Sequence, residues 1–172
     1  MQNFLSKKEI KLSKEFENKG YIIRDIKDIK SLDLIRKQIL KPIKKKLRIK
    51  EKDKISDEEI LNFAHRKIKK NNLNDLRLSI FNEINSHKNF RKNYYNISKE
   101  FLDLLIGNEV SMQLRVNLSI QLPNDKTSLL PLHSDVWSGD SPYEIVVWLP
   151  LVNCFKTKSM FILPPKKYSK LK

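Results

Sequence analysis

The chain has 172 residues, of which 40% are hydrophobic and 32% are charged, and its formal net charge is +15. This length suits one domain with a buried core, and the hydrophobic content excludes an intrinsically disordered protein. A single cysteine, Cys154, excludes both a disulfide framework and a zinc site built from cysteines.

The positive charge is concentrated in the first part of the chain. Residues 111–172 carry eight lysines and arginines against four acidic residues, which leaves a net charge of +11 in residues 1–110. Such a surface attracts phosphates, nucleic acid or anionic lipid, but scattered lysines without interleaved aromatic residues make nucleic acid an unlikely partner. The sequence shows no signal-peptide core and no stretch of membrane-spanning length, so we expect a cytoplasmic protein without a membrane partner.

Helical periodicity dominates the chain up to about residue 108. It predicts a first amphipathic helix that ends near Gly20, because glycine is the usual residue after a helix end. The sequence at 21–26 suggests a short strand. A second helical stripe then begins near Ile29, and Pro42 is expected to interrupt it.

Three further helices are predicted before the pattern changes. Ser56, followed by Asp57, Glu58 and Glu59, forms a capping box and predicts a helix to about residue 68. The stretches 72–87 and 98–106 repeat the helical pattern, and Gly107 closes the second of them.

From residue 110 onward the apolar residues alternate with polar ones. In residues 112–122 every even position is apolar and every odd position is polar, which predicts a half-buried strand. Residues 143–152 are apolar on both faces and predict a buried strand, and 158–165 predict a shorter one. We therefore expect an α+β fold, or a β-barrel with a helical extension, divided into regions 1–108 and 109–172.

His133 and Asp135 are the candidate metal ligands. Residues i and i+2 of an extended chain point to the same side, so this imidazole and this carboxylate can converge on one metal ion. One more histidine would complete a facial triad of two histidines and one carboxylate, as in Fe(II) oxygenases. On spacing alone, a polar turn with an exposed histidine is the better explanation of the tripeptide, and only the surrounding sequence favours a metal site.

The surrounding sequence resembles a known enzyme family. The matching elements are Asn117 with "IQLP" after it, "LHSDVWSGDSPYE", "WLPLV" and "TKSMFILPP". Together they resemble the sporadic carbohydrate cluster 2-oxoglutarate-Fe(II) oxygenases, a family similar to the phytanoyl-CoA dioxygenases. The resemblance covers residues 100–165 well and the helical half only loosely.

This resemblance implies a fold and an activity. The fold would be a double-stranded β-helix, the cupin-like jelly roll, of which residues 109–172 are a part. His133 and Asp135 would bind Fe(II), and oxidative decarboxylation of 2-oxoglutarate with O₂ would drive hydroxylation of an unactivated C–H bond. The implied substrate is a carbohydrate or nucleotide sugar of polysaccharide biosynthesis.

Within the implied barrel, the polar side of the first strand has a candidate role. Gln113, Arg115 and Asn117 would bind the 2-oxoglutarate co-substrate, with Arg115 as the bidentate partner of a carboxylate. A strand whose polar side simply meets water accounts for the same residues. The candidate substrate-binding residues are Gln121, Trp137, Tyr143 and Glu144.

The sequence departs from the family pattern after the HxD motif. The family has a second iron-binding histidine further on, with an arginine or similar cation after it for 2-oxoglutarate, but no histidine follows His133. The two others, His65 and His87, lie in the helical half. Three strands are also too few for a jelly roll of eight. We therefore expect a C-terminally truncated oxygenase with impaired activity.

Two other functions remain open at this point. One is a non-catalytic basic protein whose helical half binds phosphates or nucleic acid. The other is a cupin-type sugar isomerase with a different metal.

Overall fold

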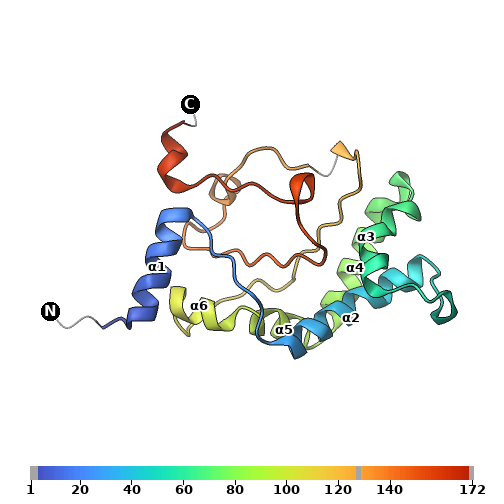
Figure 1. Cartoon of the computed structure of the whole chain (residues 1–172), viewed down its shortest axis with the longest axis horizontal. Coiled ribbons are helices and arrows are strands. Elements are labelled where there is room, and N and C mark those ends of the chain that lie inside the picture. The colour runs from blue at the N-terminus through green and yellow to red at the C-terminus, as the bar shows by residue number, and fades with distance from the viewer. Residues whose placement is uncertain (1–3, 127–128, 171–172) are drawn as a thin grey trace.

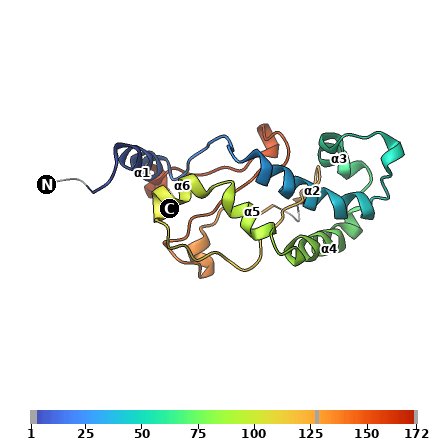
Figure 2. The ribbon, with the colours of Figure 1, turned by 90° about the horizontal axis from the view of Figure 1, so that it is seen from below.

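A computed structural model describes residues 4–126 and 129–170. Six α-helices occupy the first part of the described chain; in Figure 1, α1 lies at the left, and the other helices follow the lower and right-hand sides. Their bounds are α1 Lys7–Lys19, α2 Ile29–Lys46, α3 Asp57–Phe63, α4 Leu73–Ser86, α5 Phe90–Asn96 and α6 Lys99–Ile106. Seen from below, α1, α6, α5 and α2 follow one another along the molecule (Figure 2).

After α6 the chain is extended and irregular. Its regular elements are short 3₁₀ turns at Asp135–Ser138, Lys156–Lys158 and Pro165–Lys170, and the described residues contain no β-strand. The predicted jelly roll, or double-stranded β-helix, is therefore wrong. The part of the α+β prediction that required a sheet is wrong with it, and so is the expectation that the described chain has the architecture of a dioxygenase.

Local capping sequences set the helix ends. The Ser56 hydroxyl accepts from the Glu59 amide at 3.1 Å, and the Glu59 carboxylate accepts from the Ser56 amide at 3.0 Å, which confirms the predicted capping box. Gly20 follows α1 with φ of 77°, a left-handed conformation that only glycine adopts without strain. The predicted ends of the first helix and of the helix closed by Gly107 are confirmed in the same way.

Two expectations about the helical half are wrong. Residues 21–26 form no strand, and α2 continues through Pro42 to Lys46. A proline inside a helix costs about 3 kcal/mol because its ring lacks an amide hydrogen and crowds the preceding turn. Pro42 is fully buried between Leu40 and Ile43, which are buried as well, so burial on both sides of the proline offsets this cost.

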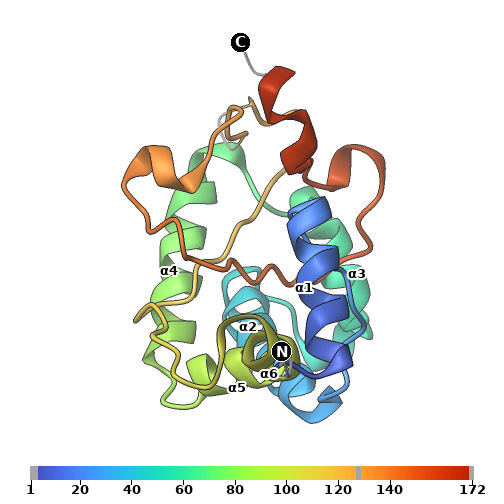
Figure 3. The ribbon, with the colours of Figure 1, turned by 90° about the vertical axis from the view of Figure 1, so that its left-hand side faces the viewer.

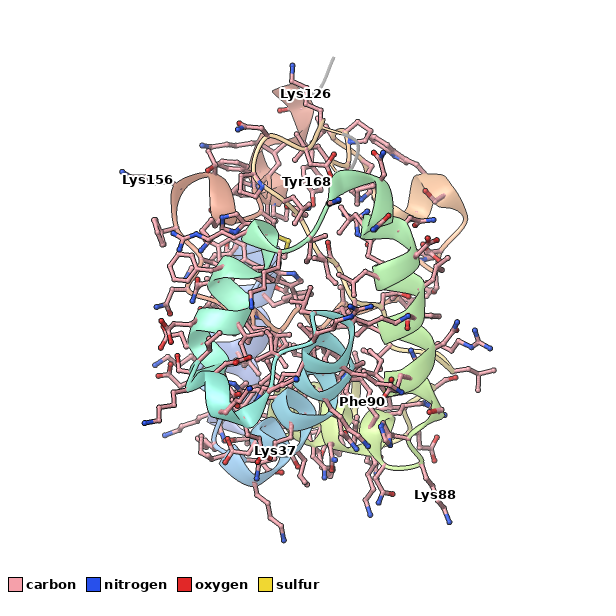
Figure 4. The ribbon with its side chains drawn as sticks, turned by 90° about the vertical axis from the view of Figure 1, so that its right-hand side faces the viewer. Lys37, Lys88, Phe90, Lys126, Lys156 and Tyr168 are labelled. Atoms are coloured by element: carbon pink, nitrogen blue, oxygen red, sulfur yellow. The ribbon has the colours of Figure 1, made fainter. Side chains whose placement is uncertain are left out.

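The hydrophobic core lies between α2 and the helices that pack on it. Helix α2 contacts α3, α4 and α5, and Phe90 at the start of α5 is fully buried among them (Figure 4). The buried residues of this core are Ile35, Ile39, Leu40, Ile43, Ile60, Leu76, Ile80, Ile84, Phe90, Ile97 and Val116. Val116 belongs to the extended chain, so the core joins the helical layer to the segment that follows it.

Side chains from the helices hold this extended segment in place. The Asn85 side chain of α4 accepts from the Val116 amide at 2.8 Å and donates to the Val116 carbonyl at 3.0 Å. The Nε atom of Arg77, also on α4, donates to the Ile120 carbonyl at 2.9 Å. Arg77 and Asn85 are eight residues apart on the helix, and Val116 and Ile120 are four residues apart in the extended chain. Both separations correspond to roughly 12–13 Å, so the two side chains match the spacing of the backbone groups that they bind.

The predicted alternation of residues 112–122 is partly confirmed. Val116 is buried, Met112, Leu118 and Ile120 pack against the core, and the odd-numbered positions are exposed. Leu114 is the exception, with 83% of its surface exposed. The side chains of this segment therefore alternate between core and solvent as in a half-buried strand. Its backbone hydrogen bonds, however, go to side chains of α4 and not to a neighbouring strand.

The opposite edge of this segment has free backbone groups. In an extended chain, alternate residues direct their backbone N–H and C=O groups to opposite edges. The backbone groups of Gln113, Arg115, Asn117 and Ser119 form no hydrogen bond with any described residue. We name the backbone of residues 113–119 on this side the free edge.

Residues 143–152 cross the molecule near the first extended segment in Figure 3, and the Tyr94 hydroxyl donates to the Val147 carbonyl at 2.7 Å. Burial raises the pKa of Tyr94. Leu149 and Leu151 pack against the core, whereas Val146 and Trp148 are 61% and 48% exposed. The prediction that both faces of this segment are buried is therefore wrong.

Helix α1 is joined to the rest of the helical layer by Glu100 of α6. Its carboxylate accepts from Lys8 of α1 at 2.6 Å and from Lys27, just before α2, at 2.7 Å. Hydrogen bonds from Lys27, which has the larger effect, and from Lys8 lower the pKa of Glu100 from 4.5 to about 2. The ionised carboxylate therefore stabilises the folded state.

Replacing Glu100 with glutamine should destabilise the protein at neutral pH. The stability that Glu100 contributes is fully present above a pH of about 4.5 and is lost as the pH falls toward about 2, because protonation breaks both ion pairs. Urea unfolding of both proteins across this range measures the difference. Glu17→Gln is the control, because Glu17 is exposed on α1 and forms no ion pair with the described residues. A difference that does not change with pH would contradict the assignment.

None of the helices in the described part of the chain has the length and apolar character needed to cross a lipid bilayer.

Candidate functional site

The backbone around His133 brings it close to Asp135. Ser134 is extended, with φ of −123° and ψ of 138°, and Asp135 begins the 3₁₀ turn Asp135–Ser138. One extended residue between them places both side chains on the same side of the chain. Nε2 of His133 lies 3.5 Å from Oδ1 of Asp135.

A backbone carbonyl fixes the orientation of the His133 ring. Nδ1 of His133 lies 2.7 Å from the carbonyl oxygen of Pro131. A carbonyl oxygen only accepts hydrogen bonds, so Nδ1 carries the proton in this contact. In the neutral ring, Nε2 then has a free lone pair, and this lone pair is on the side of the Asp135 carboxylate.

Two electron-pair donors that lie this close repel each other unless a cation lies between them. A proton on Nε2 supplies one such cation, and a metal ion supplies another. Histidines that bind metals commonly donate their other ring N–H to a carbonyl, as His133 does to Pro131.

The pair is only part of an iron site. Its side chains are 42% and 51% exposed, so water has access to both. In the described residues no group of three or more histidine, cysteine, aspartate or glutamate side chains is placed to hold a metal. His65 lies in a 3₁₀ turn after α3, and His87 caps α4. The residues present therefore fit two ligands of the implied triad and do not supply the third.

The other candidate site residues lie on the surface. Gln113, Arg115, Asn117 and Gln121 are exposed along the first extended segment, and the Arg115 guanidinium lies 5.8 Å from the centre of the Phe81 ring. Trp137 and Tyr143 are 70% and 89% exposed. Glu144 is exposed as well, and its amide donates to the Ser141 carbonyl at 3.0 Å. Among the described residues, no hydrogen bond or ion pair joins Arg115, Tyr143 or Glu144 to the His133–Asp135 pair.

Two structural features were missed in the sequence. The anchoring role of Arg77 and Asn85 depends on their spacing of eight residues on one face of α4, which a search for polar residues inside a predicted apolar helix would have noticed. The second feature is an apolar groove between α2 and α3 with cationic residues beside it. The alternation of cationic and apolar residues from Leu47 to Lys50 was its signal in the sequence.

Comparisons with known protein families, with curated proteins and with solved structures found no match for this chain.

Proposed function

We propose that this chain binds a divalent cation through His133 and Asp135, as two ligands of an Fe(II)/2-oxoglutarate-dependent oxygenase site that acts on a carbohydrate or nucleotide sugar. The orientation of His133 supports this proposal. Its Nδ1 contacts the Pro131 carbonyl at 2.7 Å, which leaves Nε2 free beside the Asp135 carboxylate. In a polar turn with no ligand, a proton on Nε2 would have to relieve the repulsion between these two electron-pair donors.

Each part of the site would have a distinct role. Bound Fe(II) would supply the redox chemistry that couples 2-oxoglutarate decarboxylation to C–H hydroxylation. Arg115 forms no ion pair with the described residues, so its guanidinium is available to a carboxylate, with Gln113 and Asn117 on the same side of the segment. Gln121, Trp137, Tyr143 and Glu144 are the proposed substrate contacts, since aromatic and amide side chains suit a sugar.

The proposal includes low activity for the chain as described. Two protein ligands completed by water hold Fe(II) weakly, and no third ligand is among the described residues. The purified chain with Fe(II), O₂ and 2-oxoglutarate should therefore release succinate no faster than a metal-free blank. Succinate release above that blank would show that the site is more complete than these residues indicate.

Replacing either ligand should weaken cation binding by about tenfold or more, because only one protein ligand would remain. Isothermal titration with Co(II) measures the affinity of His133→Ala and Asp135→Asn against the unmodified chain. Binding should also weaken as the pH falls, since protons compete for Nε2. His65→Ala is the control and should bind as the unmodified chain does. Unchanged binding by both ligand variants would refute the site.

A further inference from the structure

An apolar groove of about 200 Å³ lies at the far end of the helical layer, where α2 ends and α3 runs beside it. Figure 4 shows this end of the molecule facing the viewer. Aliphatic and aromatic side chains from the end of α2, the connection after it and α3 make its walls: Leu47, Ile49, Ile55, Ile60 and Phe63. The groove is open to solvent along one side, since Phe63 is 43% exposed.

Two cations without an ion-pair partner among the described residues lie in the lining of this groove. Arg66 and Lys67 belong to its lining, and Arg48 and Lys50 alternate along the chain with the wall residues Leu47 and Ile49. All four are exposed, and none forms an ion pair with the described residues. An anion at the mouth of the groove would therefore meet Arg66 and Lys67, which form no ion pair with the described residues.

Two acidic residues near the groove, Asp57 and Glu59, form contacts of their own. Asp57 pairs with Lys44 at 2.6 Å. Glu59, which belongs to the groove lining, accepts from the amide and the hydroxyl of Ser56 at 3.0 Å each, and these bonds lower its pKa. Asp57 therefore has a counter-ion of its own, whereas Glu59 keeps its negative charge and offsets part of the positive charge of Arg66 and Lys67 in the lining.

Arg66 links the charge to the apolar wall. Its guanidinium lies 4.3 Å from the centre of the Phe63 ring, a cation–π contact that holds the positive group at the edge of the groove. A guanidinium in this position presents its planar fork of donors to a carboxylate, phosphate or sulfate group. An apolar body attached to such a group would lie against Phe63 and the aliphatic side chains.

We propose that this groove binds a small anionic amphiphile, with its apolar body between α3 and the connection that precedes it and its acidic head group on Arg66 and Lys67. The proposal goes beyond the cation site and is independent of it, because none of these residues belongs to the His133–Asp135 pair. It also differs from general phosphate binding by a basic surface, because the apolar walls should contribute to the affinity. Each buried methylene group should tighten binding about fourfold until the groove is filled.

Titration of the full chain with alkyl sulfates tests the proposal by nuclear magnetic resonance. Hexyl, octyl and decyl sulfate, each below its critical micelle concentration, should bind with increasing affinity and shift the amide signals of Ile49, Ile55 and Phe63. Inorganic sulfate should bind much more weakly, and decyltrimethylammonium should leave these signals unchanged. His133→Ala should bind decyl sulfate as the unmodified chain does.

A pair of charge-reversal variants isolates the cations at the groove. Arg66→Glu with Lys67→Glu should weaken decyl sulfate binding roughly tenfold or more, because two attractions become repulsions. Lys11→Glu with Lys14→Glu changes the net charge equally on exposed positions of α1 and should have no effect. Circular dichroism checks that both variants keep the helical content of the unmodified chain.

Several outcomes would overturn the proposal. Equal binding by the two charge-reversal variants, or equal binding of the cationic amphiphile, would remove the role of the charges. Inorganic sulfate binding as tightly as decyl sulfate would remove the role of the groove. Cosedimentation with anionic phospholipid vesicles without binding of monomeric decyl sulfate would indicate a membrane surface in place of a single bound amphiphile.

Discussion

Ile80→Ala should lower the free energy of unfolding by about 3 kcal/mol, within the range measured for large-to-small changes in protein cores. Ile80 lies on α4 and is fully buried in the core that joins α4 to α2 and α5. The substitution removes apolar surface from the core and leaves a cavity there, while alanine itself favours the helix. Urea unfolding followed by circular dichroism measures the loss.

Leu78→Ala is the matched control on the same helix. Leu78 lies two residues before Ile80, but 52% of it is exposed, so its removal should cost less than about 0.5 kcal/mol. Similar losses for both variants would mean that α4 does not present this face to the core.

Asn85→Ala should have the second-largest effect, about 2–3 kcal/mol. Val116 is 4% exposed, and both its amide and its carbonyl bond to the Asn85 side chain. Alanine would leave these two buried backbone groups without partners. The amide of Val116 should then exchange with solvent much faster, and hydrogen exchange by nuclear magnetic resonance measures this.

Two further substitutions distinguish the loss of the Asn85 hydrogen bonds from the effect of alanine on the stability of α4. Asn85→Asp keeps the acceptor for the Val116 amide and loses the donor, so its cost should be intermediate. Asn82→Ala changes an exposed residue of the same helix and should be nearly neutral. Unchanged exchange at Val116 in Asn85→Ala would show that packing alone holds the segment.

The sequence was informative wherever the cause of a structure is local. The capping box at Ser56 and the helix end at Gly20 each depend on a few neighbouring residues, and both are confirmed. Pro42 shows the limit of such rules, because burial of its neighbours in the core outweighs the local cost of proline in a helix.

The extended region shows a second limit. The alternation of apolar and polar residues correctly predicted that Met112, Val116, Leu118 and Ile120 face the core. The side on which each side chain lies depends only on the extended backbone of the segment. The alternation could not specify the hydrogen-bond partners, which come from Asn85 about thirty positions earlier in the chain. Helix α5 was missed altogether, since a helix of seven residues spans only two turns and gives a weak periodic signal.

In the candidate metal site, too, the local feature could be predicted from the sequence and the long-range feature could not. The spacing of His133 and Asp135 predicts that their side chains lie close together, and they do. A third ligand is a long-range feature, which two residues of sequence cannot specify. The resemblance to carbohydrate oxygenases remains a prediction, and the absence of a sheet from the described residues removes the fold that it implied.

The free edge of residues 113–119 affects how this protein behaves at high concentration. Its amides and carbonyls have no partner among the described residues and lie beside the exposed Leu114, and an open edge of this kind can pair with the extended chain of another molecule. A charge of +15 opposes such pairing by mutual repulsion between molecules. In molar salt the Debye length shrinks to about 3 Å, so the repulsion between protein molecules is screened. Concentrated solutions of the protein should therefore resist aggregation better at low salt than at high salt.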